Sequence, residues 1–276
     1  MSKKIIIKAV VLVTVAFFVF LYSYAKLLDN KNFKIVFNYL DNRSDNTIVN
    51  AGNGEVALFD CGDRNAFGEV CSALSGNHFY NVDYVFITTT DEEHIGYLNE
   101  LIKIYDIKEV FICENNSSDK SIELAYKSAR EKNVKIHYLK NNEAVKIGEM
   151  LVNALLVPTG ENEEKVCSIF RVEYKDLSCM LLGSISGFSQ KYLLEKYPEF
   201  FSDTDIVRIP HTYNEDLTYP PLLDAISPTY AVYSTDYFNT LSQNYFKSCN
   251  IKLYPIKNSS VIVTYKNNKI TINEKN

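Results

Sequence analysis

The chain lacks several features that would assign a function directly. Its six cysteines never occur as C-x-x-C, so no zinc knuckle or thioredoxin-like redox motif is visible. The formal net charge is −5 and no basic stripe is present, which argues against tight, non-specific binding of nucleic acid. No long linker, internal repeat or low-complexity segment interrupts the 276 residues. These absences indicate an ordinary globular chain.

The cysteines fall into two groups. Cys113, Cys167 and Cys179 lie in apolar, strand-like runs, where we expect them to behave as small buried residues. Cys61 and Cys71 are close enough in sequence for a disulfide to be conceivable outside the cell. The sequence cannot fix the Cα separation on which such a bond depends.

One long hydrophobic run stands near the N-terminus. Residues Ala9–Ala25 are uncharged and mostly apolar. A membrane-spanning helix needs about 20 such residues, and Ile5–Leu28 is long enough if Lys8 and Lys26 extend their amines towards the membrane surface. We therefore predict that residues 1–28 form an N-terminal transmembrane helix and that the membrane is one partner of this chain.

The charges before the run predict its orientation. Lys3, Lys4 and Lys8 precede the apolar residues, and positive charge at this position keeps the N-terminus in the cytoplasm. We expect a single-pass protein of the cell membrane with its soluble domain outside the cytoplasm. The alternative is a cleaved signal peptide, because Ser23-Tyr24-Ala25 places small residues near a cleavage position.

Residues 33–276 have the size and pattern of one α/β domain. The chain is 46% hydrophobic and 23% charged, which supplies a sizeable core. The expected strands are 34–37, 47–49, 56–59, 84–88, 110–113, 135–139, 151–157, 168–174, 178–182, 205–209, 230–234, 261–265 and 270–272. The expected helices are 65–75, 93–105, 120–132, 190–197, 221–226 and 240–248. Two mixed sheets with helices outside them are the natural packing for this pattern.

The most informative stretch is Ile87–Leu98, which links an apolar strand to a helix through an acidic turn. Thr90 and Glu93 have the spacing of a capping box, in which both side chains bind free backbone N–H groups. On this interpretation the acidic residues serve the helix N-terminus and hold no metal. Apolar residues at helical spacing follow and predict a face directed towards the core.

The same stretch resembles the metal-binding turn of the metallo-β-lactamase superfamily, T-H-x-H-x-D-H-x-G. Thr88, His94 and Gly96 match this pattern. Thr89 and Asp91 stand where the first two histidines belong, and Glu93 stands in place of the aspartate. The resemblance implies an αββα sandwich, in which metal ions acidify a water molecule.

Further segments resemble the C-terminal domain of the ComEC family of DNA-uptake proteins. Residues 39–49 correspond to F-L-D-V-G-Q-G-D-A-I-L-I without its glycines, and residues 58–62 correspond to L-L-I-D-G-G. Asp60 in the second segment would support the metals from the second shell. Its alternative role is to start a turn before Gly62.

The second half carries three more matches. Residues 180–184 correspond to L-L-T-G-D, with Ser184 in place of the carboxylate that bridges two metals. Residues 209–213 correspond to V-P-H-H-G-S and retain one histidine, His211, beside Thr212. Residues 223–233 resemble the segment E-A-V-S-P-K-Y-A-V-I that follows this histidine in the family.

The resemblance therefore implies a degenerate metal site. Its remaining ligands would be Asp91, Glu93, His94 and His211, with Asp60 and Ser184 beside them. Our first hypothesis is a membrane-anchored protein without a cofactor, which is catalytically degenerate and acts by binding or assembly. The alternative is a hydrolase of the phosphodiesterase or nuclease type, which holds one zinc through Glu93, His94 and His211.

Other roles have less support in the sequence. A metal-independent hydrolase using Ser184 lacks an identifiable base. His78 and His137 match no ligand position of the family and are expected to be structural. The chain lacks the many membrane spans of ComEC proteins, so it cannot form a channel by itself. A protein or another envelope component is the expected partner, and the sequence does not settle whether nucleic acid also binds.

Overall fold

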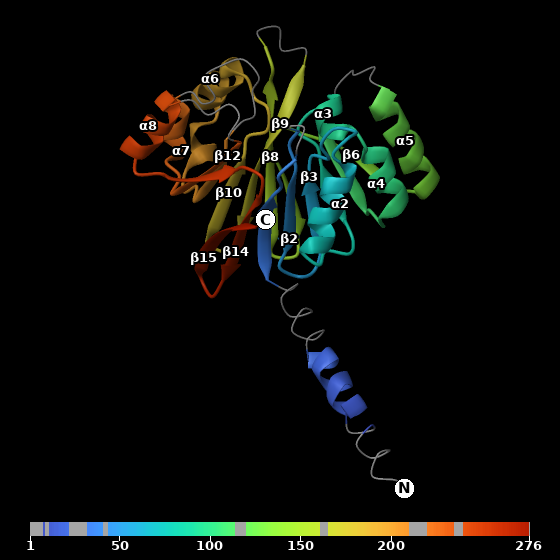
Figure 1. Ribbon diagram of the computed structural model, residues 1–276. Helices are drawn as coiled ribbons and strands as arrows, with labels where there is room; N and C mark the ends of the chain where they lie inside the picture. Colours follow the sequence, from blue (N-terminus) through green and yellow to red (C-terminus); the bar gives the residue numbers. More distant parts are fainter. Residues whose placement is uncertain are drawn as a thin grey trace.

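Two β-sheets lie face to face between two layers of helices in the computed structural model (Figure 1). The structure describes residues 8, 11–21, 32–40, 44–113, 120–160, 165–209, 220–234 and 240–275. This is the predicted α/β sandwich of the αββα type, and the architecture follows from strands that are apolar on both faces, because each sheet is covered on both sides.

The first sheet contains the N-terminal strands and a C-terminal hairpin. Its strands are β1 (Phe33–Phe37), β2 (Thr47–Ala51), β3 (Val56–Phe59), β4 (Tyr84–Phe86), β5 (Glu109–Cys113), β6 (Lys135–Leu139), β14 (Ser260–Lys266) and β15 (Lys269–Lys275). The spatial order is β15-β14-β1-β2-β3-β4-β5-β6, and the pairs from β3 to β6 are parallel. The C-terminal hairpin therefore joins the sheet beside β1.

The second sheet is built from the middle of the chain. Its strands are β7 (Glu143–Ile147), β8 (Met150–Pro158), β9 (Val166–Tyr174), β10 (Leu177–Leu181), β11 (Ile206–Arg208), β12 (Tyr230–Ser234) and β13 (Lys252–Ile256). They lie in the order β13-β12-β11-β10-β9-β8-β7. The β10–β11 and β11–β12 pairs are parallel, so residues that follow these strands meet at one edge of the sheet.

Helices cover the outer face of each sheet. Those beside the first sheet are α2 (Phe67–Gly76), α3 (Glu92–Ile95), α4 (Leu98–Ile104) and α5 (Lys120–Lys132). Those beside the second are α6 (Gly187–Lys196), η1 (Pro198–Phe201), α7 (Pro220–Ile226) and α8 (Thr240–Ser248). Each helical layer has its own apolar cluster against its sheet. The third cluster lies between the two sheets.

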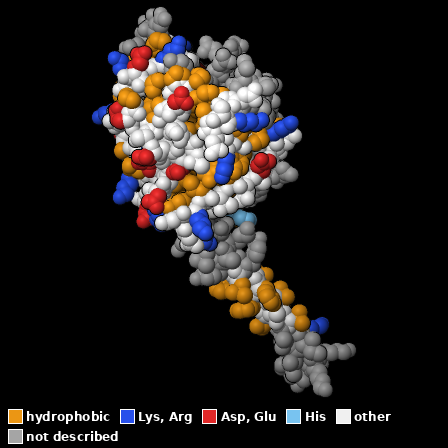
Figure 2. Space-filling model, turned by 90° about the vertical axis from the view of Figure 1, so that its left-hand side faces the viewer, with side chains coloured by type: hydrophobic (Ala, Val, Ile, Leu, Met, Phe, Trp, Pro, Cys, Tyr) orange, Lys and Arg blue, Asp and Glu red, His pale blue; other side chains and the backbone are white. Residues whose placement is uncertain are grey.

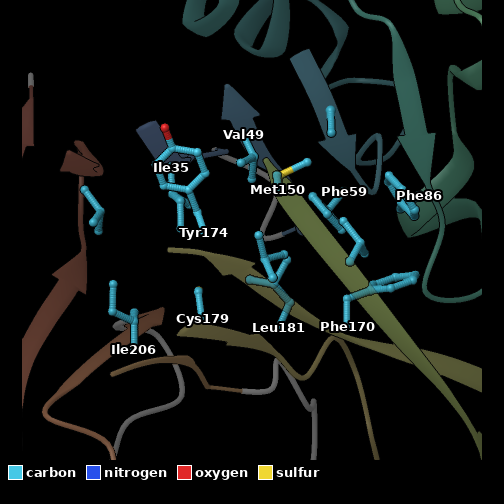
Figure 3. Close-up of a cluster of buried hydrophobic side chains, with 14 of the residues drawn as sticks. Ile35, Val49, Phe59, Phe86, Met150, Phe170, Tyr174, Cys179, Leu181 and Ile206 are labelled. Carbon is cyan, nitrogen blue, oxygen red and sulfur yellow. The ribbon is translucent and has the colours of Figure 1, made fainter. Parts of the chain in front are cut away.

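Aromatic rings fill the space between the sheets. Phe59 and Phe86 are stacked with their ring centroids 4.9 Å apart, and Phe170 of the second sheet meets Phe59 edge-on at 5.4 Å (Figure 3). Phe111 continues the stack on the other side of Phe86 at 4.5 Å. Because these rings come from β3, β4, β5 and β9, they hold the ends of the two sheets together close to the predicted site.

Most predicted elements are present, with three differences. β7 and β13 were not predicted, because β7 has two charged residues among its five and β13 contains Pro255. The helix predicted over residues 93–105 consists of two helices, α3 and α4, separated at Gly96–Tyr97. Cys61 and Cys71 are both free, so the conceivable disulfide is not formed.

The N-terminal segment stands apart from the sandwich. Residues 11–21 are helical, and their large apolar side chains are exposed, from 42% for Leu21 to 74% for Leu12 (Figures 1 and 2). The rest of the predicted span, residues 1–7, 9–10 and 22–28, lies outside the described residues. Within the described part of the chain, no helix is long and apolar enough to cross a membrane.

Candidate functional site

Three polar residues from distant parts of the chain meet at one edge of the sandwich. Asp60 directly follows β3, His94 lies in α3 after β4, and Ser184 follows β10 in the second sheet. The parallel pairing of β3 with β4 brings the first two together, since equivalent ends of parallel strands share a sheet edge. A backbone hydrogen bond from Ser168 N to Thr88 O (2.7 Å) ties β9 to the same edge.

Asp60 is a buried carboxylate held in a strained backbone turn. Its φ is 56°, a left-handed value that a non-glycine residue adopts at some cost. Its Oδ1 accepts a hydrogen bond from Thr88 N (2.8 Å), and its Oδ2 accepts one from Thr88 Oγ1 (2.8 Å). Asp60 thus fixes the turn after β4 and also faces His94. Its predicted role beside a metal stays a prediction.

His94 is buried, with 3% of its surface exposed, and both of its ring nitrogens have partners. Nδ1 lies 3.1 Å from Asp60 Oδ2, and Nε2 lies 3.2 Å from Ser184 Oγ. Burial acts to lower the pKa of His94, but the charge and hydrogen bond of Asp60, with the charges of Asp45 and Asp91, raise it to about 9. The imidazole is therefore protonated at neutral pH and forms an ion pair with Asp60.

A second buried ion pair, which was not predicted from the sequence, lies near Asp60 and His94. Arg208 at the end of β11 places Nη2 3.3 Å from Asp45 Oδ1, and both residues are at most 7% exposed. Arg208 Nη1 also donates to the Ile209 carbonyl (3.1 Å). The available signal was an arginine inside the apolar run Ile206–Ile209. A buried arginine requires an anionic partner, although the sequence did not say which one.

Asp91, Glu93 and His94, the candidate metal ligands that the structure describes, do not gather into a coordination shell. Asp91 is exposed and accepts a hydrogen bond from Thr89 Oγ1 (3.1 Å). Glu93 is exposed while its neighbour His94 is buried, so the two side chains leave α3 on different sides. His211 and Thr212 lie outside the described residues. The described residues contain no cluster of three His, Cys, Asp or Glu side chains suited to a metal ion.

The capping-box prediction is wrong in its details. Asp91, and not Thr90, is the N-cap residue of α3, and its side chain makes no capping hydrogen bond. Thr90 is 1% exposed and its Oγ1 has no hydrogen-bond partner within the described part of the chain. The N-cap of α3 therefore lies one residue after Thr90, whose side chain is buried.

Backbone contacts explain why the glycine of the motif is present. Cys61 N donates to His94 O (2.7 Å), and Gly96 N donates to Gly62 O (3.0 Å). A Cβ atom on Gly96 would lie 2.4 Å from Arg64 N, which is too close for any side chain. The turn after β3 and the end of α3 are therefore packed backbone to backbone, and this contact positions Asp60 opposite His94.

The two remaining histidines lie elsewhere and have local partners. His137 in β6 is 3.2 Å from Glu109 Oε1 and 2.8 Å from Glu143 Oε1, so it joins the edge strands of the two sheets. His78 has its Nδ1 3.3 Å from Tyr80 Oη. The expectation that both are structural agrees with these contacts.

Comparison with known proteins identifies the fold. No protein-family profile matches the chain. It is 20% identical over 163 residues to ComE operon protein 3 of Bacillus subtilis (strain 168), a match that covers 58% of this chain and 21% of that protein. The chain thus spans only about a fifth of the relative's length, within which the similarity agrees with the predicted ComEC-like relationship.

Solved structures agree with this assignment. The metallo-β-lactamase-fold protein YhfI of Bacillus subtilis superposes with a TM-score of 0.56 at 12% identity, over 81% of this chain and 95% of YhfI. Igni18, a metallo hydrolase of Ignicoccus hospitalis, superposes with a TM-score of 0.55 at 12% identity, over 85% of this chain and 100% of its own. At such low identity the likeness establishes the metallo-β-lactamase fold and no activity.

Proposed function

We propose that this chain is a membrane-anchored, extracytoplasmic protein of the metallo-β-lactamase fold that has lost metal-dependent hydrolysis and acts by binding or assembly. The observation that carries the proposal is the environment of His94. Its two ring nitrogens are directed at Asp60 and Ser184, two groups of the protein itself. A metal ion would have to displace one of these partners.

Ligand count supports the same conclusion. A catalytic zinc is held by three protein side chains and keeps a fourth position for water. Thr89 and Ser184 provide hydroxyl groups where imidazole or carboxylate would be needed, and the exposed Glu93 side chain lies on a different side of α3 from His94. No specific observation favours the one-zinc hydrolase that would use Glu93, His94 and His211.

The N-terminal segment supports the membrane part of the proposal. Residues 11–21 expose Val, Leu and Phe side chains, and Figure 2 shows them on the surface of a helix that extends away from the sandwich. Water is a poor solvent for such a surface, whereas a lipid bilayer would bury it. The proposed partner of the exported domain is a protein or another envelope component, because the net charge of −5 does not favour nucleic acid.

Hydrolysis assays test the loss of metal chemistry. Full-length protein would be incubated with bis(p-nitrophenyl) phosphate and with the chromogenic β-lactam nitrocefin, each with added zinc and with EDTA. We expect no difference in turnover between the two conditions. Zinc-dependent turnover that disappears in His94→Ala would contradict the proposal and favour the one-zinc hydrolase.

Fractionation and a C-terminal reporter test the topology. We expect the protein in the membrane fraction and its C-terminus accessible to protease added to intact, cell-wall-free cells. A reporter that is active only in the cytoplasm would contradict the orientation. Release of the mature domain into the medium would instead indicate cleavage after Ala25.

A further inference from the structure

The contacts of His94 define a chain of three side chains that runs from the protein interior to the surface. Asp60 is 2% exposed and His94 is 3% exposed, whereas Ser184 is exposed. The separations are 3.1 Å between Asp60 Oδ2 and His94 Nδ1, and 3.2 Å between His94 Nε2 and Ser184 Oγ. Both lie within the range at which a base activates a nucleophile and a third group orients the base.

The proton positions follow from the chemistry of the groups. An ionised carboxylate only accepts hydrogen bonds, so the Asp60 contact places a proton on His94 Nδ1. In the neutral imidazole the lone pair is then on Nε2, which faces the Ser184 hydroxyl. Thr88 donates to both oxygens of Asp60 through N and Oγ1, at 2.8 Å each, and so prevents the carboxylate from rotating away.

The local backbone presents Ser184 to solvent. Gly183, directly before it, has a φ of +57° and forms a tight turn shortly after the end of β10. A Cβ on Gly183 would lie 3.1 Å from Thr88 Cγ2, so glycine lets this turn approach the β4 edge. The turn therefore directs a serine from the second sheet at a histidine from the first.

We propose that Ser184 is a metal-independent nucleophile that attacks carboxylic esters, with His94 as its general base and Asp60 as the positioning residue. The Ser184 Oγ–H proton moves to His94 Nε2 while Oγ forms a bond to the carbonyl carbon. The leaving alkoxide takes that proton from His94, which leaves an acyl ester on Ser184. Water then attacks the acyl carbon, gives a proton to His94 and releases the carboxylic acid, and the same proton returns to Ser184.

This activity goes beyond the proposed binding role and rests only on the metal-free interpretation of the site. The sequence alone shows no base for Ser184. The base lies 90 positions away along the chain, in the turn that resembles a metal site. The three residues meet only once the two sheets are packed.

An active-site-directed fluorophosphonate tests the proposal on full-length protein in detergent with EDTA present throughout. Labelling forms a bond between Ser184 Oγ and phosphorus, breaks the P–F bond, releases fluoride and transfers the serine proton to His94. Intact-protein and peptide mass spectrometry at pH 7.5 and pH 9.5 would report the adduct and its position. We expect one adduct, on Ser184, that forms faster at pH 9.5 than at pH 7.5, because only the neutral imidazole can accept the serine proton.

Variants separate an activated serine from a merely exposed one. Ser184→Ala should abolish the adduct, and His94→Gln should slow its formation by about 10²-fold or more, the range of a lost general base. Ser75→Ala is the matched control, since Ser75 is an exposed serine of α2 that bonds to a backbone carbonyl, and it should label like the wild type. Circular dichroism would confirm that each variant is folded.

Asp60→Asn is expected to slow labelling and to change its pH profile, while Asp60→Glu restores part of the rate. The proposal is overturned if folded wild-type protein forms no Ser184 adduct with millimolar probe at either pH. It is also overturned if folded His94→Gln labels as fast as the wild type. Because EDTA is present, these outcomes are independent of the zinc-dependent assays that test the proposed function.

Discussion

The charged side chains at this edge of the sandwich lie in buried pairs of opposite charge. His94 faces Asp60, and Arg208 faces Asp45, with all four side chains almost fully buried. Burying a charge is costly unless a partner of opposite charge lies beside it, so removal of one partner costs more than the pair contributes. The chain therefore places cationic side chains among the carboxylates at this edge.

Arg208→Met should therefore destabilise the protein strongly. The variant leaves Asp45 buried without its cation, and the loss of one member of a buried pair costs about 3 kcal/mol. Urea denaturation of the full-length protein would measure the change in the free energy of unfolding. The double variant Asp45→Asn with Arg208→Met should recover much of the loss. Equal losses in the single and double variants would show that the pair is not coupled.

The raised pKa of His94 makes part of the stability depend on pH. The folded-state pKa of about 9 lies above the unfolded value near 6.5, so the protonated imidazole stabilises the fold below pH 6.5. This contribution, on the order of 3 kcal/mol, is lost as the pH rises from 6.5 through 9. Buried thiols such as Cys179 also have a raised pKa, so they add their own pH dependence to the stability at alkaline pH. The contribution of His94 is therefore measured as the difference in the free energy of unfolding between the wild type and His94→Gln. This difference should shrink between pH 6.5 and pH 9. A difference that stays constant would contradict the ion pair between His94 and Asp60.

The sequence indicated which residues matter at the edge but not their partners. Asp60, His94 and Ser184 were all identified from the segments that resemble known motifs. Their contacts were not predicted, because the three residues are far apart in the sequence and meet only in the folded structure. The ion pair between Asp45 and Arg208 was not predicted for a different reason. It joins β11 to the segment before β2, and residues 163 positions apart leave no local sequence pattern.

At the scale of elements, the break between α3 and α4 is the feature that positions the site. Sequence periodicity predicted one helix here, since the apolar spacing continues across Gly96 without interruption. The tertiary contact of Gly96 N with Gly62 O ends α3 early, and only a glycine allows that approach. β7 and β13 were missed for a related reason, because they are edge strands whose exposed positions lack the apolar pattern.

Gly96→Ala should unfold the edge of the site. The added Cβ meets the backbone of Asp63 and Arg64 at 2.4 Å, and neither atom belongs to a flexible side chain. We expect a loss of about 3 kcal/mol or more, at the upper end of single substitutions. Gly68→Ala in α2 is the control, because its Cβ would meet nothing within 4 Å and a helical alanine gains up to about 1 kcal/mol. Thermal unfolding would compare the two, and similar effects would argue against the packed turn.

At the scale of the whole molecule, the C-terminus closes the first sheet. β14 pairs with β1 over five register positions, from Phe33↔Tyr265 to Phe37↔Val261. The first strand of the sandwich therefore lies beside the C-terminal hairpin of β14 and β15, and the second sheet is formed by the chain between them. The pattern of strands and helices predicted two mixed sheets with helices outside them, and the resemblance to the superfamily predicted the αββα sandwich, whereas the strand order within each sheet was not predicted.

This topology predicts cooperative unfolding. The segment from residue 33 to the C-terminus should fold without the N-terminal helix and lose its structure in one transition, since neither half can complete the first sheet alone. Chemical denaturation followed by far-ultraviolet circular dichroism and by tyrosine fluorescence should give coincident curves. Two separated transitions, each retained in an isolated half of the chain, would contradict a single domain.

The metal content of the protein tests the central claim most directly. Full-length protein would be purified without chelators, exposed to a small excess of zinc, dialysed and measured by inductively coupled plasma mass spectrometry. We predict less than one zinc per chain and no change on His94→Ala, because both ring nitrogens of His94 already have protein partners. One tightly bound zinc per chain that is lost in both His94→Ala and His211→Ala would contradict the account.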